Sequence, residues 1–377
     1  GLRYLNGDLP PFFYKVWGSV STTPIFKNSD HDAIRPLGVK SSLIRDLHKQ
    51  VVTKNKGPLN DHLEPQQLAL SKAGGCKLVH QVRMLSEKRR DFIVVKLDMR
   101  NAHNEVSRAA VIEALESEPS LRHLSWHAAT CLASHTGLEC GGKLWGEAGE
   151  GTAQGDPESS GWFCVAWHQE VRDLDAILAE HGGLARFGND DGYLVGPADI
   201  VFPALEQFAT RVRDKCLLQL QVTKTEVFTW QDNLPACTPQ GMKRAGVQVG
   251  DQWHSGFVCY GIPVGTSEYV KQMLSEKVQE VKGEVNKVKE VLGEEDGQAM
   301  WSILKCSLAQ KLDWHLSLCY PSDISAAAAE LDSALWDMLE HATKLHIPKG
   351  EEGLGVECTL LVPGIAVLQG RSFQNSN

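Results

Sequence analysis

Three aspartates occupy positions from which a protein could hold divalent cations. Asp98 directly follows Phe92–Leu97, a compact apolar and β-branched run that is typical of a buried strand. Asp190 and Asp191 lie within Gly188–Gly192, which has the composition of a hairpin tip. An Asp-Asp turn is often only an exposed turn, but apolar strands on both sides would bury this one in a sheet, where unpaired carboxylates are costly. Two cations about 3.5–4 Å apart can clamp the attacking and leaving oxygens of a phosphoryl displacement, and Mg²⁺ prefers such oxygen ligands.

The elements that must position these aspartates follow from hydrophobic periodicity. The first 230 residues read as a mixture of strands and helices, and the remainder as mostly helical. The expected strands around the Asp-Asp turn are Leu184–Phe187 and Tyr193–Val195, with a further extended segment at Val222–Trp230. The expected helices are Ser42–Val52, Gln66–Ser71, Gly74–Leu85, Arg108–Glu116, a helix that begins with Asp156 as cap and Pro157 in the first turn and runs to about Glu180, and Ala204–Leu218.

A heptad-like seam marks the C-terminal region. In the segment that begins at Ser267, apolar residues from Leu274 to Leu292 step by four and three, over fewer than three heptads. This pattern favours a long helix that packs within its own domain over a dimerising coiled coil.

Composition limits the class of protein. The 377 residues are 42% hydrophobic, which excludes wholesale disorder, and the length suggests two or three domains. The longest apolar run, Leu360–Leu368, is interrupted by Pro363 and Gly364 and is too short to span a bilayer. We therefore expect no membrane association. Without a leader segment, and with ten scattered cysteines read as reduced thiols, an intracellular protein, nuclear or cytoplasmic, is expected.

The charge balance is acidic, with one basic region. The net charge of −9 argues against a nucleic-acid-binding protein, because such proteins are typically basic overall. The segment Arg35–Lys56, however, carries six basic residues and the single acid Asp46. The positions of basic side chains matter more for phosphate binding than the net charge does, so the sequence leaves a nucleic-acid partner possible.

A stripe of His127, Cys131 and His135, followed by Cys140, offers metal-ligating side chains four residues apart. Consecutive turns of one helix cannot surround one ion, so a buried polar stripe is favoured over a metal site.

Three segments around the aspartates resemble the catalytic motifs of reverse transcriptases. Lys96–Asn104 is similar to the first palm motif, with Ala102 four places and the bulky His103 five places after the aspartate. Gly151–Pro157 contains the Gln-Gly-Asp-Pro sequence of the family, and Gly188–Asp191 occupies the place of its aromatic-x-Asp-Asp turn.

Further segments in the same order resemble the enzymes of non-LTR (LINE-like) retroelements. Lys224–Phe228 and Tyr260–Gly265 are similar to the motifs that follow the catalytic turn, the second being a hairpin that grips the primer. Upstream, Arg35–Val39, Pro65–Gln67 and Gly74–Gly75 are similar to motifs of the fingers. The likeness covers nearly the whole chain.

The resemblance implies an α+β, right-hand polymerase fold. Fingers would occupy residues 1–90 and part of 109–150, and the palm, an antiparallel sheet with helices, residues 91–265. A helical thumb-like and C-terminal region would occupy 266–377. The implied activity is an RNA-directed DNA polymerase that adds dNTPs to the 3′ end of a DNA or RNA primer on an RNA template.

The resemblance also implies the residues that bind the metal. Asp98, Asp190 and Asp191 would be catalytic and would hold Mg²⁺, with Mn²⁺ as the alternative ion. His103 would stand at the sugar gate, where bulk excludes a 2′-hydroxyl.

Five further residues would bind the substrates. Arg35, and less directly Lys27, would meet the triphosphate from the fingers, because arginine suits bidentate phosphate contacts. Gln154 and Gly155 would lie under the incoming nucleotide and the template base, and Lys224 would lie near the phosphates. Four tryptophans could stack on bases, although two or three of them are expected in the core: Trp126, Trp145, Trp162 and Trp167.

Departures from the family pattern leave a second interpretation open. The aromatic residue of the catalytic turn is replaced by Gly188, with Phe187 one place earlier, and the gate carries a histidine in place of Phe or Tyr. The alternative is a catalytically decayed or repurposed palm-fold protein that binds nucleic acid. A viral RNA-dependent RNA polymerase is disfavoured because His103 stands where that class carries a second aspartate.

Overall fold

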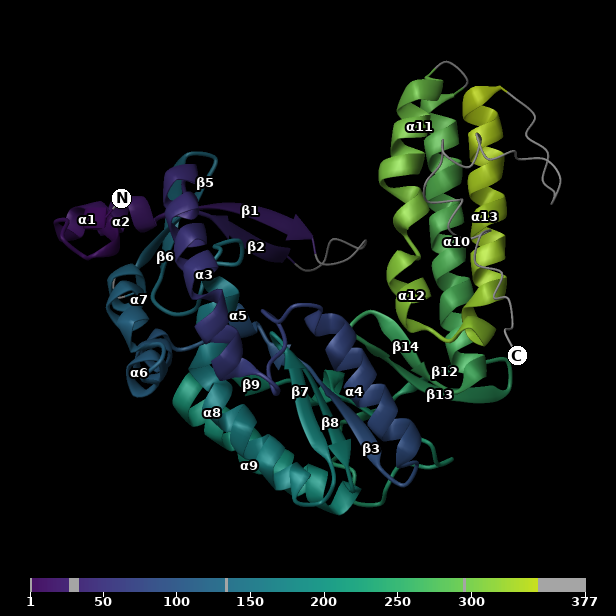
Figure 1. Cartoon of the computed structure of the whole chain (residues 1–377), viewed down its shortest axis with the longest axis horizontal. Helices are drawn as coiled ribbons and strands as arrows, with labels where there is room; N and C mark the ends of the chain where they lie inside the picture. The colour runs from purple at the N-terminus through teal and green to yellow at the C-terminus, as the bar shows by residue number, and fades with distance from the viewer. Residues whose placement is uncertain (1, 27–33, 133–134, 294–295, 345–377) are drawn as a thin grey trace. The chain divides into compact units, whose positions relative to one another are not determined.

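The computed structural model describes residues 2–26, 34–132, 135–293 and 296–344. Within these ranges the chain is a mixed α/β structure with antiparallel and mixed sheets, and it forms two compact units, Gly1–Ala245 and Gly246–Asn377 (Figure 1). No helix in the described ranges is long and apolar enough to cross a membrane.

A five-stranded sheet forms the centre of the N-terminal unit. Its strand order is β11-β10-β3-β8-β7, antiparallel except for the β10–β11 pair. The strands are β3 (Ile93–Leu97), β7 (Leu184–Gly188), β8 (Asp191–Gly196), β10 (Glu226–Thr229) and β11 (Lys243–Arg244). The expected central strand and hairpin are confirmed.

Helices cover both faces of this sheet, which is why its central strand is apolar except for Lys96. Val94 and Val95 point to opposite faces and are both fully buried. On β7, Phe187 packs against α8 (Ser159–Ala179) and α9 (Ala198–Cys216) through Trp167 and Phe208. The neighbouring Arg186 points the other way and donates from Nε to Gln81 of α4 (Gly74–Lys88) at 2.6 Å. Helix α4 therefore lies on the opposite face from α8 and α9.

A second, four-stranded sheet has the order β2-β1-β5-β6. Its strands are β1 (Val20–Phe26), β2 (Ile34–Val39), β5 (Thr136–Cys140) and β6 (Lys143–Ala148), and β1 and β5 run parallel. The other helices of the N-terminal unit are α1 (Leu2–Leu5), α2 (Pro11–Gly18), α3 (Ser42–Leu63), α5 (Ala102–Glu105), α6 (Arg108–Ser117), η1 (Arg122–Leu124), α7 (Ser125–Leu132) and η2 (Val222–Lys224). A two-stranded pair joins β4 (Met99–Arg100) to β9 (Gln219–Leu220).

The C-terminal unit joins a three-stranded sheet to a group of helices. The sheet contains β12 (Gly246–Val249), β13 (Gln252–Cys259) and β14 (Ile262–Gly265). The helices are α10 (Ser267–Leu292), α11 (Gly297–Cys306), η3 (Leu308–Gln310), α12 (Asp313–Leu318) and α13 (Pro321–Thr343). The seam of α10 buries Leu274, Val278, Val281 and Val285, and the helix packs on α11 and α13 (Figure 1). The prediction of packing within one domain is confirmed.

The two units meet in sequence at Ala245 and Gly246, before the expected end of the palm at residue 265. Strands β13 and β14 group with α10 because they pack directly against it. Gly256 lies so close to the Tyr269 ring that a Cβ there would stand 2.0 Å from Cδ1. The end of the expected C-terminal region, residues 345–377, lies outside the described residues.

Two local predictions are wrong. Gln66–Ser71 is not a helix: Gln67 forms a parallel bridge with Phe187 at the edge of the five-stranded sheet. Helix α8 begins at Ser159, with Glu158 at its cap position. The carboxylate of Asp156, expected as the cap, is held by Lys40 at 2.6 Å.

Candidate active site

The register of β3 and β8 brings the three predicted aspartates to one end of the five-stranded sheet. Leu97 is paired with Gly192, so Asp98, the next residue of one strand, lies opposite Asp191, the preceding residue of the other. Asp190 is in the turn between β7 and β8, where Gly188 is paired with Asp191. The structure therefore places all three aspartates at the same end of the sheet.

The charged side chains at this end of the sheet affect one another's pKa values. Burial raises the pKa of Asp191, and the negative charges of Asp190 and Asp98 raise it further, while Lys96 acts in the opposite sense. Mutual repulsion of carboxylates is what a bound cation relieves, and an all-oxygen donor set suits Mg²⁺. Among the described residues, however, the group whose potential metal-binding atoms all lie within 4.8 Å of one another is not these aspartates. It is a separate group around His127.

The turn that carries Asp190 is held by a glutamine whose role the sequence did not reveal. Asn189 adopts a left-handed conformation with φ of 60°. Its N–H donates to Oε1 of Gln67 at 2.9 Å, and its carbonyl accepts from Nε2 of the same side chain at 2.9 Å. The backbone on either side is also tied, because Phe187 donates to Gln66 and Leu68 donates to Phe187. Gln67 is 2% exposed, so these bonds are shielded from water.

The departure at Gly188 is accommodated by Phe187, which lies in the core. Its ring centroid is 5.1 Å from that of Trp167 and 6.0 Å from that of Phe208. Gly192 leaves the space for this ring, since a Cβ there would stand 2.3 Å from it. An aromatic residue thus anchors the turn from one place earlier in the chain.

His103 lies beside the start of α8, where several groups fix its ring. The ring stacks on Phe163 with centroids 4.4 Å apart, and Nδ1 lies 3.3 Å from Oγ of Ser159 and 3.5 Å from Oγ1 of Thr152. The next residue of α8, Cys164, donates to the side chain of Asn189 at 3.6 Å. Consecutive residues of α8 therefore touch both the predicted gate and the aspartate turn.

The segment Gln154–Pro157 packs against the end of β2. The carbonyl of Gln154 accepts from the N–H of Gly38 at 3.0 Å. Gly155 has φ of 110°, and a Cβ there would stand 2.8 Å from the Gly38 carbonyl oxygen, so the close approach requires glycine. Gly155 itself is exposed and Gln154 is half-buried.

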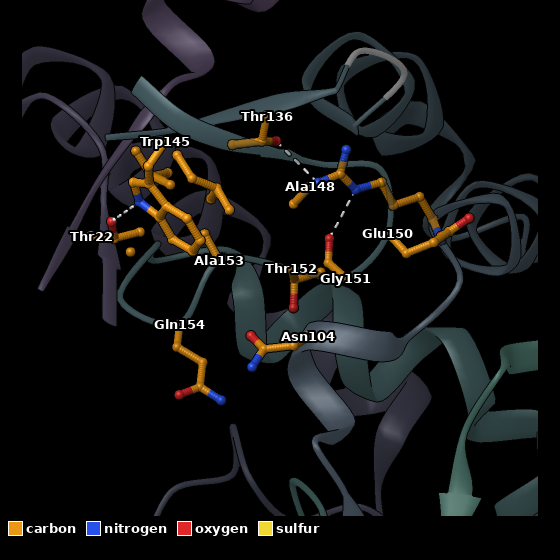
Figure 2. A pocket seen from close by; sticks show the side chains of 14 residues that line it. Thr22, Asn104, Thr136, Trp145, Ala148, Glu150, Gly151, Thr152, Ala153 and Gln154 are labelled. Carbon is orange, nitrogen blue, oxygen red and sulfur yellow. Dashed lines mark hydrogen bonds between the residues drawn. The ribbon is translucent and has the colours of Figure 1, made fainter. Parts of the chain in front are cut away.

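A pocket of about 220 Å³ lies beside this segment, between it and the four-stranded sheet (Figure 2). Asn104 and Gln154 lie on one side of it, and Trp145, whose Nε1 donates to Thr22 at 2.9 Å, lies on the other. The buried Arg108 braces the wall by donating to the carbonyl of Gly151 at 2.9 Å. The pocket thus combines an aromatic face with side-chain amides.

Asp156 is the centre of a buried ionic network that the sequence did not predict. It accepts from Lys40 at 2.6 Å and lies 3.0 Å from Nδ1 of His48 on α3. Burial by itself raises the pKa of Asp156, but these two partners lower it well below its ordinary value. The network fixes the Gln154–Pro157 segment to α3 and to Lys40, the residue that follows β2.

The remaining predicted site residues are not brought to a common point by the described contacts. Lys224 ends η2 and is exposed. Arg35 is in β2 with its backbone paired to Ile25, and Lys27 lies outside the described residues. Of the four tryptophans, Trp162 and Trp167 are buried, while the exposed pair comprises Trp126 and Trp145.

Comparison with solved structures relates this fold to telomerase. Apo telomerase from Candida tropicalis is similar over 93% of this chain and 62% of that chain, with 10% identity and a TM-score of 0.50. Telomerase from Candida albicans in complex with a TWJ fragment of telomeric RNA matches 89% of this chain and 60% of that one, at 11% identity and a TM-score of 0.44. Apo Candida tropicalis telomerase truncated from its C-terminal domain matches 67% and 55%, at 10% identity and a TM-score of 0.45.

The chain spans between 55% and 62% of the length of these telomerases. No family model matches the chain. No curated protein matches it in sequence. The match at a TM-score of 0.50 shows a shared polymerase-type fold.

Proposed function

We propose that the chain is an RNA-directed DNA polymerase that adds dNTPs to a primer 3′ end by two-metal-ion phosphoryl transfer. One observation carries the proposal: the β3–β8 register sets Asp98 opposite Asp191, next to the turn that holds Asp190. The telomerase-like fold supports the same class of reaction. In this assignment the five-stranded sheet is the palm and the four-stranded sheet belongs to the fingers.

The three aspartates would hold Mg²⁺ or Mn²⁺, because they offer only oxygen ligands and repel one another without a cation. The bound ions would activate the primer hydroxyl and neutralise charge on the triphosphate. The chain's own part is to keep the carboxylates in place, which Gln67 does by bonding both backbone groups of Asn189.

The nucleotide would be bound by residues around the Gln154–Pro157 segment. Gln154 and the exposed Gly155 would lie under the incoming base and its template partner, while His103, stacked on Phe163, would exclude a 2′-hydroxyl. Arg35, Lys27 and Lys224 would bind the phosphates, and this part of the proposal rests on the motif resemblance.

The implied partners are an RNA template, a DNA or RNA primer and dNTPs. The order of motifs from Arg35–Val39 to Tyr260–Gly265 supports an origin in a non-LTR retroelement. Telomerase, whose fold is similar, is the subject of a structure with telomeric RNA, which supports an RNA partner for this chain.

The test is primer extension on an RNA template with Mg²⁺ and dNTPs. The wild-type chain should extend the primer and Asp190→Asn should not, because the change removes one charge from the metal site. Asp232→Asn is the matched control, since Asp232 is exposed and follows the end of β10 that is remote from the aspartates. It should extend normally.

Binding measurements distinguish the alternative function. If neither the wild type nor Asp190→Asn extends, while both bind a primer–template duplex with strong salt dependence, the chain is a palm-fold nucleic-acid-binding protein without polymerase activity. Equal extension by the wild type and Asp190→Asn would contradict the metal assignment itself.

A further inference from the structure

A second group of potential metal ligands lies away from the aspartates, around α7. The stripe identified in the sequence splits: His127 and Cys131 turn inward, while His135 and Cys140 are exposed. Two side chains from other elements complete the group. We call it the His–Cys cluster, and its members are His48, His127, Cys131 and Glu158. The sequence argument considered one helix alone, whereas these side chains come from α3, α7 and the cap residue of α8.

The donor atoms of the His–Cys cluster lie within 4.8 Å of one another. The Cys131 sulfur is 3.8 Å from Nε2 of His48 and 3.8 Å from Nε2 of His127. Ligands of a tetrahedral zinc ion, at bond lengths of about 2.0–2.3 Å, stand about 3.3–3.7 Å apart. The His127 Nε2 to Glu158 Oε1 distance of 2.7 Å is shorter, as expected for a hydrogen bond that a metal would replace. Only small movements therefore separate this arrangement from a tetrahedral site.

The surroundings of the cluster are those of oriented metal ligands. Nδ1 of His48 is 3.0 Å from Asp156, and its Nε2 lies 3.4 Å from the hydroxyl of Tyr4 and 3.8 Å from the sulfur. A carboxylate behind a histidine in this way is the usual support of a metal-bound imidazole. The second oxygen of Glu158 accepts from Trp162 at 3.3 Å, so the first is directed to His127.

Charge balance favours a divalent cation at this place. Lys40 and Asp156 neutralise each other at 2.6 Å. A thiolate at Cys131 and a carboxylate at Glu158, with two neutral imidazoles, would carry a charge of −2 in a buried space, and a divalent ion cancels it.

We propose that the His–Cys cluster binds one zinc ion with four protein ligands. Mixed sulfur, nitrogen and oxygen donors in tetrahedral arrangement select zinc over Mg²⁺, and a closed site of this kind is structural. The ion would connect α3, α7 and Glu158, the N-cap residue of α8. It thereby fixes the segment that carries Gln154 and Gly155, without taking part in phosphoryl transfer.

Metal analysis of the intact chain tests the proposal. Protein purified without chelators should contain about one equivalent of zinc per chain, and the Co²⁺-exchanged form should show a thiolate-to-cobalt charge-transfer band with the strong visible bands of tetrahedral cobalt. Cys131→Ser should lose the charge-transfer band. Cys131→Asp, which keeps an anionic ligand, should retain visible bands without it.

The matched controls are Cys140→Ser and His135→Gln, the exposed remainder of the stripe. Both should keep the zinc content and the cobalt spectrum of the wild type. The proposal is overturned if the folded wild-type chain holds less than about a tenth of an equivalent of zinc after incubation with zinc and dialysis, and shows no charge-transfer band with cobalt. This result concerns the wild type alone, so it decides the matter even where a variant fails to fold.

Discussion

Replacing Gln67 with methionine should loosen the turn that carries Asp190 while leaving the core filled. Methionine has nearly the same volume and length as glutamine but neither hydrogen-bonding group. The change therefore removes the bonds to the N–H and carbonyl of Asn189, which are both 2.9 Å long, and the bond that the N–H of Ala69 donates to Oε1 at 3.2 Å. Because the replacement creates no cavity, any effect comes from the lost hydrogen bonds.

The expected loss follows from the burial of these groups. A buried backbone group left without a partner costs about 1–3 kcal/mol. Gln67 is 2% exposed, but Asn189 and Ala69 are only half-buried, so we expect water to replace part of what the three backbone groups lose. We expect the free energy of unfolding to fall by about 2–3 kcal/mol, below the full sum of the three penalties.

The rate of primer extension should fall by more than the loss of folding stability alone would cause. The turn positions Asp190 and Asp191, and a displacement of about 1 Å at a reacting centre can cost on the order of 10²-fold in rate. Single-turnover extension should therefore slow by about that factor. Duplex binding should stay unchanged, because Gln67 carries no charge that could meet a phosphate.

Urea unfolding and single-turnover extension of the full chain measure the two effects. Gln169→Met is the control, since Gln169 is exposed on α8 and its side chain donates to Asp173 of the same helix at 2.7 Å. It should change stability by less than about 0.5 kcal/mol. The reasoning is refuted if Gln67→Met destabilises the chain as expected and yet extends at the wild-type rate.

Three further predictions address the gate, the close approach and one buried histidine. His103→Ala should raise ribonucleotide incorporation in primer extension, and an unchanged preference for dNTPs would remove His103 from the gate. Gly155→Ala should cost about 1–3 kcal/mol and reduce extension, because its Cβ would stand 2.8 Å from the Gly38 carbonyl at φ of 110°; Gly57→Ala, in an open helical position, should be neutral or stabilising in urea unfolding. Burial lowers the pKa of His168 to about 3, so the unfolded chain binds a proton below pH 6.5 that the folded chain does not. Between pH 7 and pH 5 the free energy of unfolding should fall by about 2 kcal/mol from this residue, and His168→Phe should show that much less pH dependence.

Much of the central sheet could be predicted because its signals are local. The run Phe92–Leu97 carries apolar residues on both faces, with Lys96 as the exception, because helices cover both faces, and this pattern is enough to recognise a buried strand. The glycines around Asp190 and Asp191 likewise marked the turn. The long seam of α10 was readable for the same reason, since its period is a property of one helix.

Contacts between distant segments could not be predicted in this way. Gln66–Ser71 has helical composition, but backbone hydrogen bonds from Leu68 to Phe187 and from Phe187 to Gln66 draw it to the sheet edge. The partner lies more than a hundred residues away, and no local pattern encodes it. The prediction of Asp156 as a helix cap was wrong for a related reason. The cap signature is local in the sequence, while the ion pair with Lys40 is not.

The segment around Asp156 explains why a short motif can matter to so many parts of the N-terminal unit. Gly155 approaches β2, Asp156 pairs with Lys40 after β2 and with His48 of α3, Glu158 bonds to α7, and Oγ of Ser159 lies 3.3 Å from His103. These contacts reach several elements from five consecutive residues, so a substitution at one of them shifts the backbone that the other contacts share. Loss of the zinc ion should therefore reach the nucleotide site through Glu158, as a weaker affinity for dNTPs with the aspartates intact. Loss of an aspartate should act in the opposite way, abolishing extension while the zinc content stays the same.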